Sequence, residues 1–376
     1  MKLPALCILL SLGWMHLKSQ SFDFYGSEIK FPALSVSAHD SLVKTSLVPM
    51  VLGDYIRSNI RQLNLDDWAI VLFVNKYVDA QFADAAEADK TRILTSCLFT
   101  LGMNAAIGVR NKHRMLPLVS IDKRTKYVNG PYFEQDGYKF LPVEPGKGAF
   151  GIRKLLIRSK EGNKDIRLDY TIVPIFTEQR LVKKEVFFFN DHSRLTDSLS
   201  YEYSKTYVEY FNDLPRREPN ENYYKAPVSN ALAGSLFPSL NEKVGVCGSR
   251  TDSINFLIKF VQTAIEFRED IEIYGKKDFC SFPEGTLAMG EGDCEDKCEL
   301  FAFLIAHYFH DLDLLFLYYP HHVRVGLADP TVPVGTKTYH TFNGQKYFIV
   351  ELQNGATVLG DQIFTKNPDY PSKVVR

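Results

Sequence analysis

The chain has 376 residues, of which 45% are hydrophobic and 24% charged, so it has the balance of a folded protein of two or three domains. Its 44 basic and 45 acidic residues leave a formal net charge of -1, which argues against nucleic acid or an anionic membrane as a partner. Aromatic residues make up 13% of the chain, a share that favours β-rich packing.

The N-terminus has the layout of a secretory signal peptide. Lys2 precedes an apolar run at 3–14, and small polar residues follow at 19–21. The apolar run is too short to span a bilayer comfortably. We therefore expect residues 1–21 to be a leader. The mature protein is expected to be exported, periplasmic or secreted, with no membrane insertion once the leader is removed.

Residues 22–148 are expected to form an N-terminal domain of helices followed by strands. Apolar residues recur there at three- and four-residue spacing, and the later segments are short and apolar, with an Asp-Gly turn signal at 136–137. The expected helices cover 42–60, 68–82 and 90–101, and the expected strands cover 117–121 and 138–141.

Residues 149–225 are expected to form a small antiparallel β module that ends in a linker. Polar and apolar residues alternate there with a period of two, and Tyr, Phe, Ile and Val are frequent. The expected strands cover 154–158, 166–176, 185–189 and 199–211, and a polar, proline-containing linker covers 214–222.

Residues 226–376 are expected to form the C-terminal domain. Helices at 253–267 and 294–309 flank a glycine-rich loop, and strands follow at 314–319, 322–327 and 347–353. Helices followed by a run of strands indicate an α+β fold.

The first half of the chain resembles the last in its order of helix, strand and strand. The spacing of the matching segments places Cys294 on Ala85 and Glu351 on Pro142. A first copy would therefore have lost its thiol and its carboxylate. This order of elements is common, so a chance match remains the alternative.

Five cysteines remain after the leader: Cys97, Cys247, Cys280, Cys294 and Cys298. An odd number in an oxidising compartment predicts at least one free thiol. Cys247 and Cys280 are a candidate disulfide whose geometry the sequence leaves open. Cys294 and Cys298 lie one helical turn apart, so we expect them to share a helix face rather than a bond.

Residues 292–296 read Gly-Asp-Cys-Glu-Asp and resemble the start of a helix. Asp293 is a good N-cap, which places Cys294 in the first turn. The helix dipole there is expected to favour the reactive thiolate by about 0.3–1 kcal/mol, although the charges of Glu295 and Asp296 oppose it. The alternative is a small, buried structural cysteine.

Two further residues complete a candidate catalytic set. His322 opens a strand after a Tyr-Pro pair, and Glu351 lies in an apolar, aromatic strand where an unpaired charge would be costly. A thiol, an imidazole and a carboxylate are the parts of a cysteine nucleophile with its base and orienting acid. The alternatives are a surface histidine and a salt bridge from Glu351 to Arg324.

Three segments carry a resemblance to the transglutaminase-like superfamily, most closely to its exported bacterial cysteine proteinases. They are the run at 292–296, Tyr-Pro-His-His-Val-Arg-Val-Gly at 319–326, and Tyr-Phe-Ile-Val-Glu at 347–351. The resemblance covers the region from about residue 250 to about residue 365 and is weaker over 40–145. Glu351 stands where many relatives have Asp, and Arg324 is bulkier than usual, which puts activity in doubt.

This resemblance implies a papain-like α+β core at 226–376 and a degenerate copy of it at 22–148. It implies Cys294 as nucleophile, His322 as general base and acid, and Glu351 as the orienting carboxylate. The reaction would cleave a peptide or amide bond in a protein or peptide substrate through a thioester, with no cofactor and no metal. The alternatives are a catalytically inactive binding module and a crosslinking transglutaminase.

Two other signals are set aside. A zinc site of Cys294, Cys298, His321 and His322 is disfavoured because the cysteines are not spaced as in a zinc knuckle. The glycine-rich segment 146–151 precedes a strand-like segment rather than a helix, so we interpret it as an interdomain turn and not as a dinucleotide-binding loop.

Overall fold

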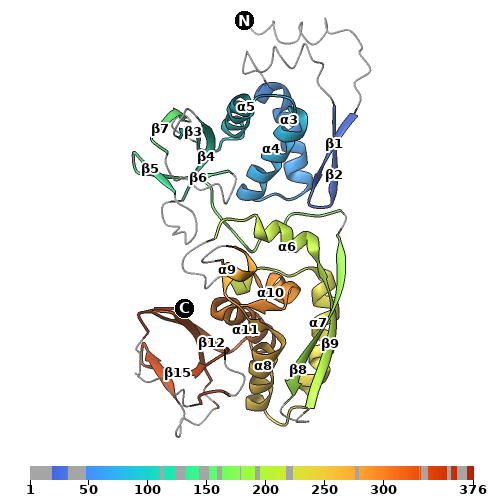
Figure 1. Cartoon of the computed structure of the whole chain (residues 1–376), viewed down its shortest axis with the longest axis vertical. Helices are drawn as coiled ribbons and strands as arrows, with labels where there is room; N and C mark the ends of the chain where they lie inside the picture. The colour runs from blue at the N-terminus through green and yellow to red at the C-terminus, as the bar shows by residue number, and fades with distance from the viewer. Residues whose placement is uncertain are drawn as a thin grey trace, which may run out of the picture.

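The computed structural model shows an α+β chain in two lobes, with the N-terminal lobe above the C-terminal lobe in Figure 1. It describes residues 19–32, 48–110, 114–122, 132–143, 152–158, 163–177, 179–190, 195–216, 223–275, 279–329, 331, 338–353, 357–361 and 371–376.

The described part of the N-terminal lobe contains a hairpin, three helices and a five-stranded antiparallel sheet in the order β5-β6-β4-β3-β7. The hairpin is β1 (Ser19–Phe24) with β2 (Ser27–Pro32), and the helices are α3 (Val48–Gln62), α4 (Asp67–Gln81) and α5 (Glu87–Thr100). The strands are β3 (Ala105–Val109), β4 (Met115–Ile121), β5 (Phe133–Gln135), β6 (Tyr138–Pro142) and β7 (Lys154–Arg158). The helices expected at 68–82 and 90–101 and both expected strands are confirmed, within a few residues. Of the helix expected at 42–60, residues 48–60 are confirmed and residues 42–47 lie outside the described residues.

The C-terminal lobe contains helices packed between a long two-stranded ribbon and a second five-stranded antiparallel sheet, ordered β14-β15-β13-β12-β16. Its first elements are β8 (Leu181–Asn190), β9 (Leu195–Ser204), α6 (Lys205–Asn212), η2 (Tyr223–Lys225), α7 (Asn230–Gly245), α8 (Arg250–Ala264), β10 (Glu266–Phe267) and α9 (Asp270–Ile273). Its last elements are α10 (Pro283–Met289), β11 (Glu291–Gly292), α11 (Cys294–Tyr308), β12 (Asp313–Tyr319), β13 (His322–Ala328), β14 (Tyr339–Phe342), β15 (Gln345–Val350) and β16 (Lys373–Val375).

The two five-stranded sheets have the same strand order, position for position, and each follows a helix, α5 or α11. In both, the edge hairpin turns through two residues of positive φ, Asp136-Gly137 and Asn343-Gly344, as a type I′ turn requires. Aligning these turns also aligns the first residues of the two helices. Cys294 therefore falls on Glu87, two residues from the Ala85 expected from the sequence.

In the described part of 149–225, the strands do not form one small sheet, contrary to the sequence prediction. Strand β7 pairs with β3 of the first sheet, and the β8–β9 ribbon packs against α7 and α8. The segment expected as a strand at 166–176 is irregular apart from an isolated bridge at Ile166. The last expected strand stops at Ser204, whose hydroxyl accepts a hydrogen bond from the backbone N–H of Tyr207 and so begins α6.

Helix α11 is held by its buried face. Cys298, Phe301 and Ile305 are fully buried in the C-terminal core, where α11 packs on β13. Burying a side chain as large as Phe301 stabilises the fold by roughly 1.5–3 kcal/mol. The apolar spacing of α11 therefore fixes the first turn of the helix against the start of β13.

The two lobes share aromatic residues at their junction. Phe282, at the start of α10, belongs to the core of the N-terminal lobe, and its ring lies 4.7 Å from that of Tyr223 and 4.5 Å from that of Phe211. The guanidinium of Arg216 lies over the Phe282 ring at 4.8 Å. A residue of the C-terminal lobe thus helps to complete the N-terminal core.

Three other expectations bear on the termini and the cysteines. Residues 1–18 of the expected leader lie outside the described residues, and residues 19–21 pair with 30–32 in the β1–β2 hairpin. Cys247 and Cys280 are both free thiols, so the candidate disulfide is wrong. None of the helices in the described part of the chain is both long and apolar enough to cross a bilayer.

Candidate active site

Cys294 is the first residue of α11, as expected from the sequence. The carboxylate of Asp293 accepts hydrogen bonds from the backbone N–H groups of Glu295, at 2.9 Å, and Asp296, at 3.3 Å. This N-cap satisfies two of the free donors at the helix start and fixes the direction in which the chain enters the helix. The partly buried thiol of Cys294 accepts a hydrogen bond from the backbone of Val323, the residue after His322.

Gly292, just before the N-cap, leaves little space at the start of α11. A Cβ atom at Gly292 would lie 2.8 Å from Cβ of Asp296 and 2.9 Å from its Oδ2. Gly292 also pairs with Phe267 in the short parallel bridge of β10 and β11. The residue two positions before the thiol is therefore confined between a neighbouring strand and the first turn of α11.

His322 and Glu351 are brought together although they lie 29 residues apart in the chain. Nε2 of His322, at the start of β13, lies 3.0 Å and 2.9 Å from the two carboxylate oxygens of Glu351, just after β15. The neighbouring His321 is exposed. Among the described residues, Nδ1 of His322 has no hydrogen-bond partner. This leaves one ring nitrogen oriented by the carboxylate and the other open to a second group.

Glu351 is buried and receives two further hydrogen bonds. Nε of Arg324 donates at 2.8 Å, and the backbone N–H of Gln353 donates at 2.9 Å. Burial alone would raise the pKa of Glu351, but His322, Gln353 and Arg324 together lower it to about 2. The carboxylate is therefore ionised at neutral pH, and it binds both partners that sequence reasoning had treated as alternatives.

Gln262 holds the backbone of Glu351 and Lys297 holds the backbone of Gln262, roles that sequence reasoning missed. The side-chain amide of Gln262 donates to the backbone carbonyl of Glu351 at 2.7 Å and to Thr357. The ammonium of Lys297 donates a hydrogen bond to the backbone carbonyl oxygen of Gln262 at 3.2 Å. Burial lowers the pKa of Lys297 to about 8. A lysine at an otherwise buried position one turn after Cys294 was the available signal.

The thiol is not poised as a thiolate, contrary to the sequence expectation. Burial raises the pKa of Cys294, and the charges of Asp293 and Glu295 raise it further. Hydrogen bonds from backbone groups at Val323 and at Cys294 itself lower it, but by less. Desolvation disfavours the anion more than the helix start favours it. At neutral pH this sulfur needs a base in order to react.

Three carboxylates gather near Cys294, and sequence reasoning missed them as a group. Oxygens of Asp270, Asp293 and Asp296 lie within 4.8 Å of one another. One oxygen of the fully buried Asp296 accepts the Ser281 N–H at 2.5 Å. Its Oδ2 has no hydrogen-bond partner among the described residues. Burial and the charge of Asp293 raise the pKa of Asp296.

Oxygens so close together repel one another unless they share a proton or bind a cation, and carboxylates are the ligands that hard divalent cations prefer. Within the described parts of the chain, these aspartates rather than Cys294, Cys298, His321 and His322 form the group close enough to hold a metal ion.

The three expected catalytic residues thus lie around one point, the start of β13. His322 contacts Glu351 directly, and Cys294 reaches the same strand through Val323. The described residues include no direct hydrogen bond between the Cys294 thiol and His322. A scan against protein-family models finds no match to this chain, and a search of curated proteins finds none either.

Proposed function

We propose that the protein is an exported cysteine hydrolase of the transglutaminase-like type, which cleaves peptide or amide bonds through a Cys294 thioester. The observation that carries the proposal is the His322 ring, held by Glu351 through Nε2 at 2.9 Å while Nδ1 stays open beside the strand that the thiol contacts. An oriented imidazole with one open nitrogen is what a neutral thiol requires.

The reaction begins with proton transfer. Nδ1 of His322 removes the Cys294 proton as the sulfur attacks the substrate carbonyl, and the ionised Glu351 stabilises the imidazolium that forms. The backbone N–H of Cys294 supplies one donor to the developing oxyanion. The imidazolium then protonates the leaving amine, which departs and leaves a thioester on Cys294.

Hydrolysis completes the cycle. His322 takes a proton from water as the water oxygen attacks the thioester carbonyl, and it returns that proton to the departing sulfur. The products are a carboxylic acid and the free thiol. If an amine attacked in place of water, the same steps would form a new amide, which is the crosslinking alternative.

The proposal is tested by thiol labelling followed by substrate profiling. Iodoacetamide at pH 7 should alkylate Cys294 of the folded protein faster than Cys97 or Cys298, and His322→Ala should remove that advantage. Proteome-derived peptides treated with wild type should gain new termini that Cys294→Ala does not produce. Equal labelling of all three cysteines, with no cleavage, would overturn the hydrolase.

The second candidate is a binding module that retains the fold without the chemistry. Two observations favour it: burial raises the pKa of the Cys294 thiol, and Arg324 shares the Glu351 carboxylate with His322. Under this reading, peptides bind the C-terminal lobe and remain intact, and an added primary amine is not incorporated.

Export is also part of the proposal. It rests on the basic, apolar and small-residue order of residues 1–21. Expression of the full chain in a bacterium, followed by fractionation and N-terminal sequencing, tests it. A processed protein outside the cytoplasm is expected, and an unprocessed cytoplasmic protein would contradict export.

A further inference from the structure

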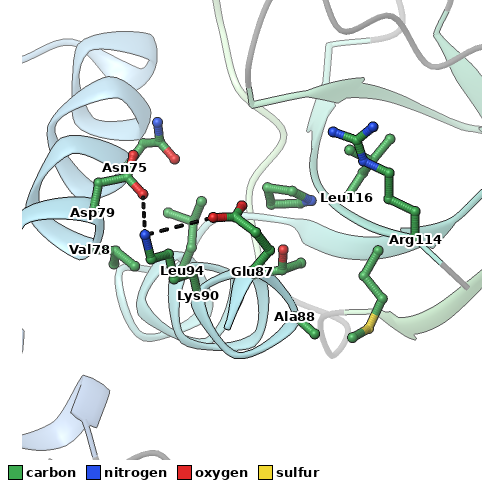
Figure 2. Close-up of a pocket in the computed structure, with 12 residues that line it drawn as sticks. Asn75, Val78, Asp79, Glu87, Ala88, Lys90, Leu94, Arg114 and Leu116 are labelled. Atoms are coloured by element: carbon green, nitrogen blue, oxygen red, sulfur yellow. Dashed lines mark ion pairs between the residues drawn. The ribbon is translucent and has the colours of Figure 1, made fainter. Parts of the chain in front are cut away.

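The N-terminal lobe has a pocket of about 240 Å³ that the proposed chemistry does not use. Figure 2 shows it between three elements: α4 forms one wall, the first turns of α5 form the floor, and the start of β4 forms the opposite wall. Its lining combines charged groups at the rim with buried apolar side chains, among them Val78, Leu94 and Leu116.

This pocket occupies the place in the first sheet that the candidate active site occupies in the second. Cys294, the first residue of α11, lies against the start of β13, and Glu87, the first residue of α5, lines the pocket opposite the start of β4. Strands β4 and β13 hold the same position in sheets of the same order. The N-terminal lobe thus has a pocket at the position where the C-terminal lobe has Cys294.

The helix start differs between the two places. Asp293 caps α11 with two hydrogen bonds, whereas Ala86 precedes α5 and provides no side-chain cap. The first N–H groups of α5 therefore lack the carboxylate that α11 has, and Ala88 of that turn lines the pocket. Free N–H groups at a helix start are suited to an anionic oxygen.

The charged groups divide the rim into two sides. Lys90 lies 3.7 Å from both Asp79 and Glu87, as the dashed lines in Figure 2 show, so one cation serves two carboxylates. Arg114, on the β4 side, is exposed and forms no ion pair with any described residue. The helix side carries the carboxylates of Asp79 and Glu87 around Lys90, while the strand side offers a guanidinium.

We propose that this pocket is a second peptide-binding site. Arg114 and the uncapped start of α5 bind a carboxylate of the peptide, and Leu94 and Pro117 receive an apolar side chain beside it. Asp79 and Glu87 face the backbone N–H groups on the other side. A planar guanidinium binds a carboxylate with two parallel hydrogen bonds, which gives direction as well as affinity.

The choice of a peptide rests on the proposed hydrolase, whereas the site itself rests on the pocket. The carboxylate can come from a peptide C-terminus or from an acidic side chain. Cleavage of a peptide bond creates a new C-terminus, so this lobe would hold substrates or products near the hydrolase without contributing a group to the reaction.

The test uses full-length Cys294→Ala protein, so that binding is measured without cleavage. Three probes are titrated by calorimetry at low salt: acetyl-Ala-Ala-Leu-Leu as the free acid, the same peptide as the C-terminal amide, and acetyl-Ala-Leu-Glu-Leu amide. Arg114→Gln removes the guanidinium. Arg92→Gln is the matched control, because Arg92 lies on α5 outside the pocket and pairs with Asp89.

At least one of the two carboxylate probes should bind more tightly than the neutral amide. Arg114→Gln should weaken that binding by about tenfold, the effect of losing a charged hydrogen bond, and Arg92→Gln should leave it unchanged. Binding of the free acid alone identifies a C-terminus as the ligand, and binding of the Glu peptide identifies a side chain.

Equal binding of all three probes, no binding of any at millimolar concentration, or full binding by Arg114→Gln would overturn the proposal. Alkylation of Cys294 in wild type is measured separately. A failure of the hydrolase therefore leaves the binding result interpretable, and a failure of this site leaves the hydrolase in place.

Discussion

The two sheets of this molecule differ at their rims far more than in their frameworks. Both have the order edge hairpin, central pair and late edge strand, and both follow a helix that packs on the central strands. At the rim, α11 begins with Cys294 after a side-chain N-cap and lies beside the imidazole of His322. Helix α5 begins without a side-chain cap and lies beside Arg114. A fold of this kind is specified by buried apolar residues and turns, so its rim can change its chemistry freely.

The largest expected difference between the lobes is in activity. Cys294→Ala should lower kcat/KM for cleavage by about 10³-fold or more, because it removes the sulfur that forms the proposed thioester. Cys97→Ala removes a buried thiol of the first lobe and should leave kcat/KM within about twofold. Cleavage assays on a peptide found by profiling compare the two. Comparable losses from both changes would mean that the chemistry is not confined to the second lobe.

The junction between the lobes gives the largest expected loss of stability. Phe282→Ala removes a buried ring that packs on Tyr223 and Phe211, and it should lower the free energy of unfolding by about 3–5 kcal/mol. The exposed Phe187→Ala is the control and should cost less than about 0.5 kcal/mol. Urea unfolding followed by circular dichroism measures both. A small effect of Phe282→Ala would indicate that the lobes are independent.

The contribution of the Glu351 carboxylate to activity can be separated from that of its partner, the Arg324 guanidinium. Glu351→Gln should lower kcat by about 100-fold or more, because an amide cannot stabilise the imidazolium as an anion does. Arg324→Gln keeps the His322–Glu351 contact and should lower kcat by less than about tenfold. Steady-state kinetics on both variants measures the split. Equal losses would make Arg324 as important as His322 in holding Glu351.

A half-buried cap in the first lobe should produce a smaller, pH-dependent effect. Burial raises the pKa of Asp66, the N-cap of α4, to about 7, against about 3.9 for an unfolded chain. The folded state therefore binds this proton more tightly, and stability should fall as pH rises from about 4 to about 7. Asp66→Asn keeps a capping oxygen but removes the titration.

Thermal melts of Asp66→Asn and wild type check this prediction. The variant should gain in Tm relative to wild type as pH rises from 5 to 8. Asp54→Asn, at a side chain that is 98% exposed, should show no such trend. A constant difference between Asp66→Asn and wild type across this range would contradict the raised pKa.

Local patterns predicted the helices and the strands that cross the two cores. They did so because apolar spacing in α4, α5 and α11 reflects burial of one face. The pairing of His322 with Glu351 was also predicted, because a carboxylate in an apolar strand needs a partner. Each of these inferences depends on residues that are close in sequence or on a single long-range contact.

What failed depends on packing between distant segments. The alternation in 149–225 did not reveal that β7 would join the first sheet and that β8 would cover the helices of the second lobe. The raised pKa of Cys294 follows from burial by elements far along the chain. The grouping of Asp270 with Asp296 depends likewise on the tertiary fold.

The close packing around Gly292 limits the substitutions that the chain can accept there. Because a Cβ atom there would collide with Asp296, every substitution displaces the acid that sits two residues beyond the thiol. Cys294, its N-cap and the buried Asp296 therefore form one unit, in which few single substitutions are tolerated. Relatives that retain glycine here should also retain the aspartate, and the loss of one should accompany the loss of the other.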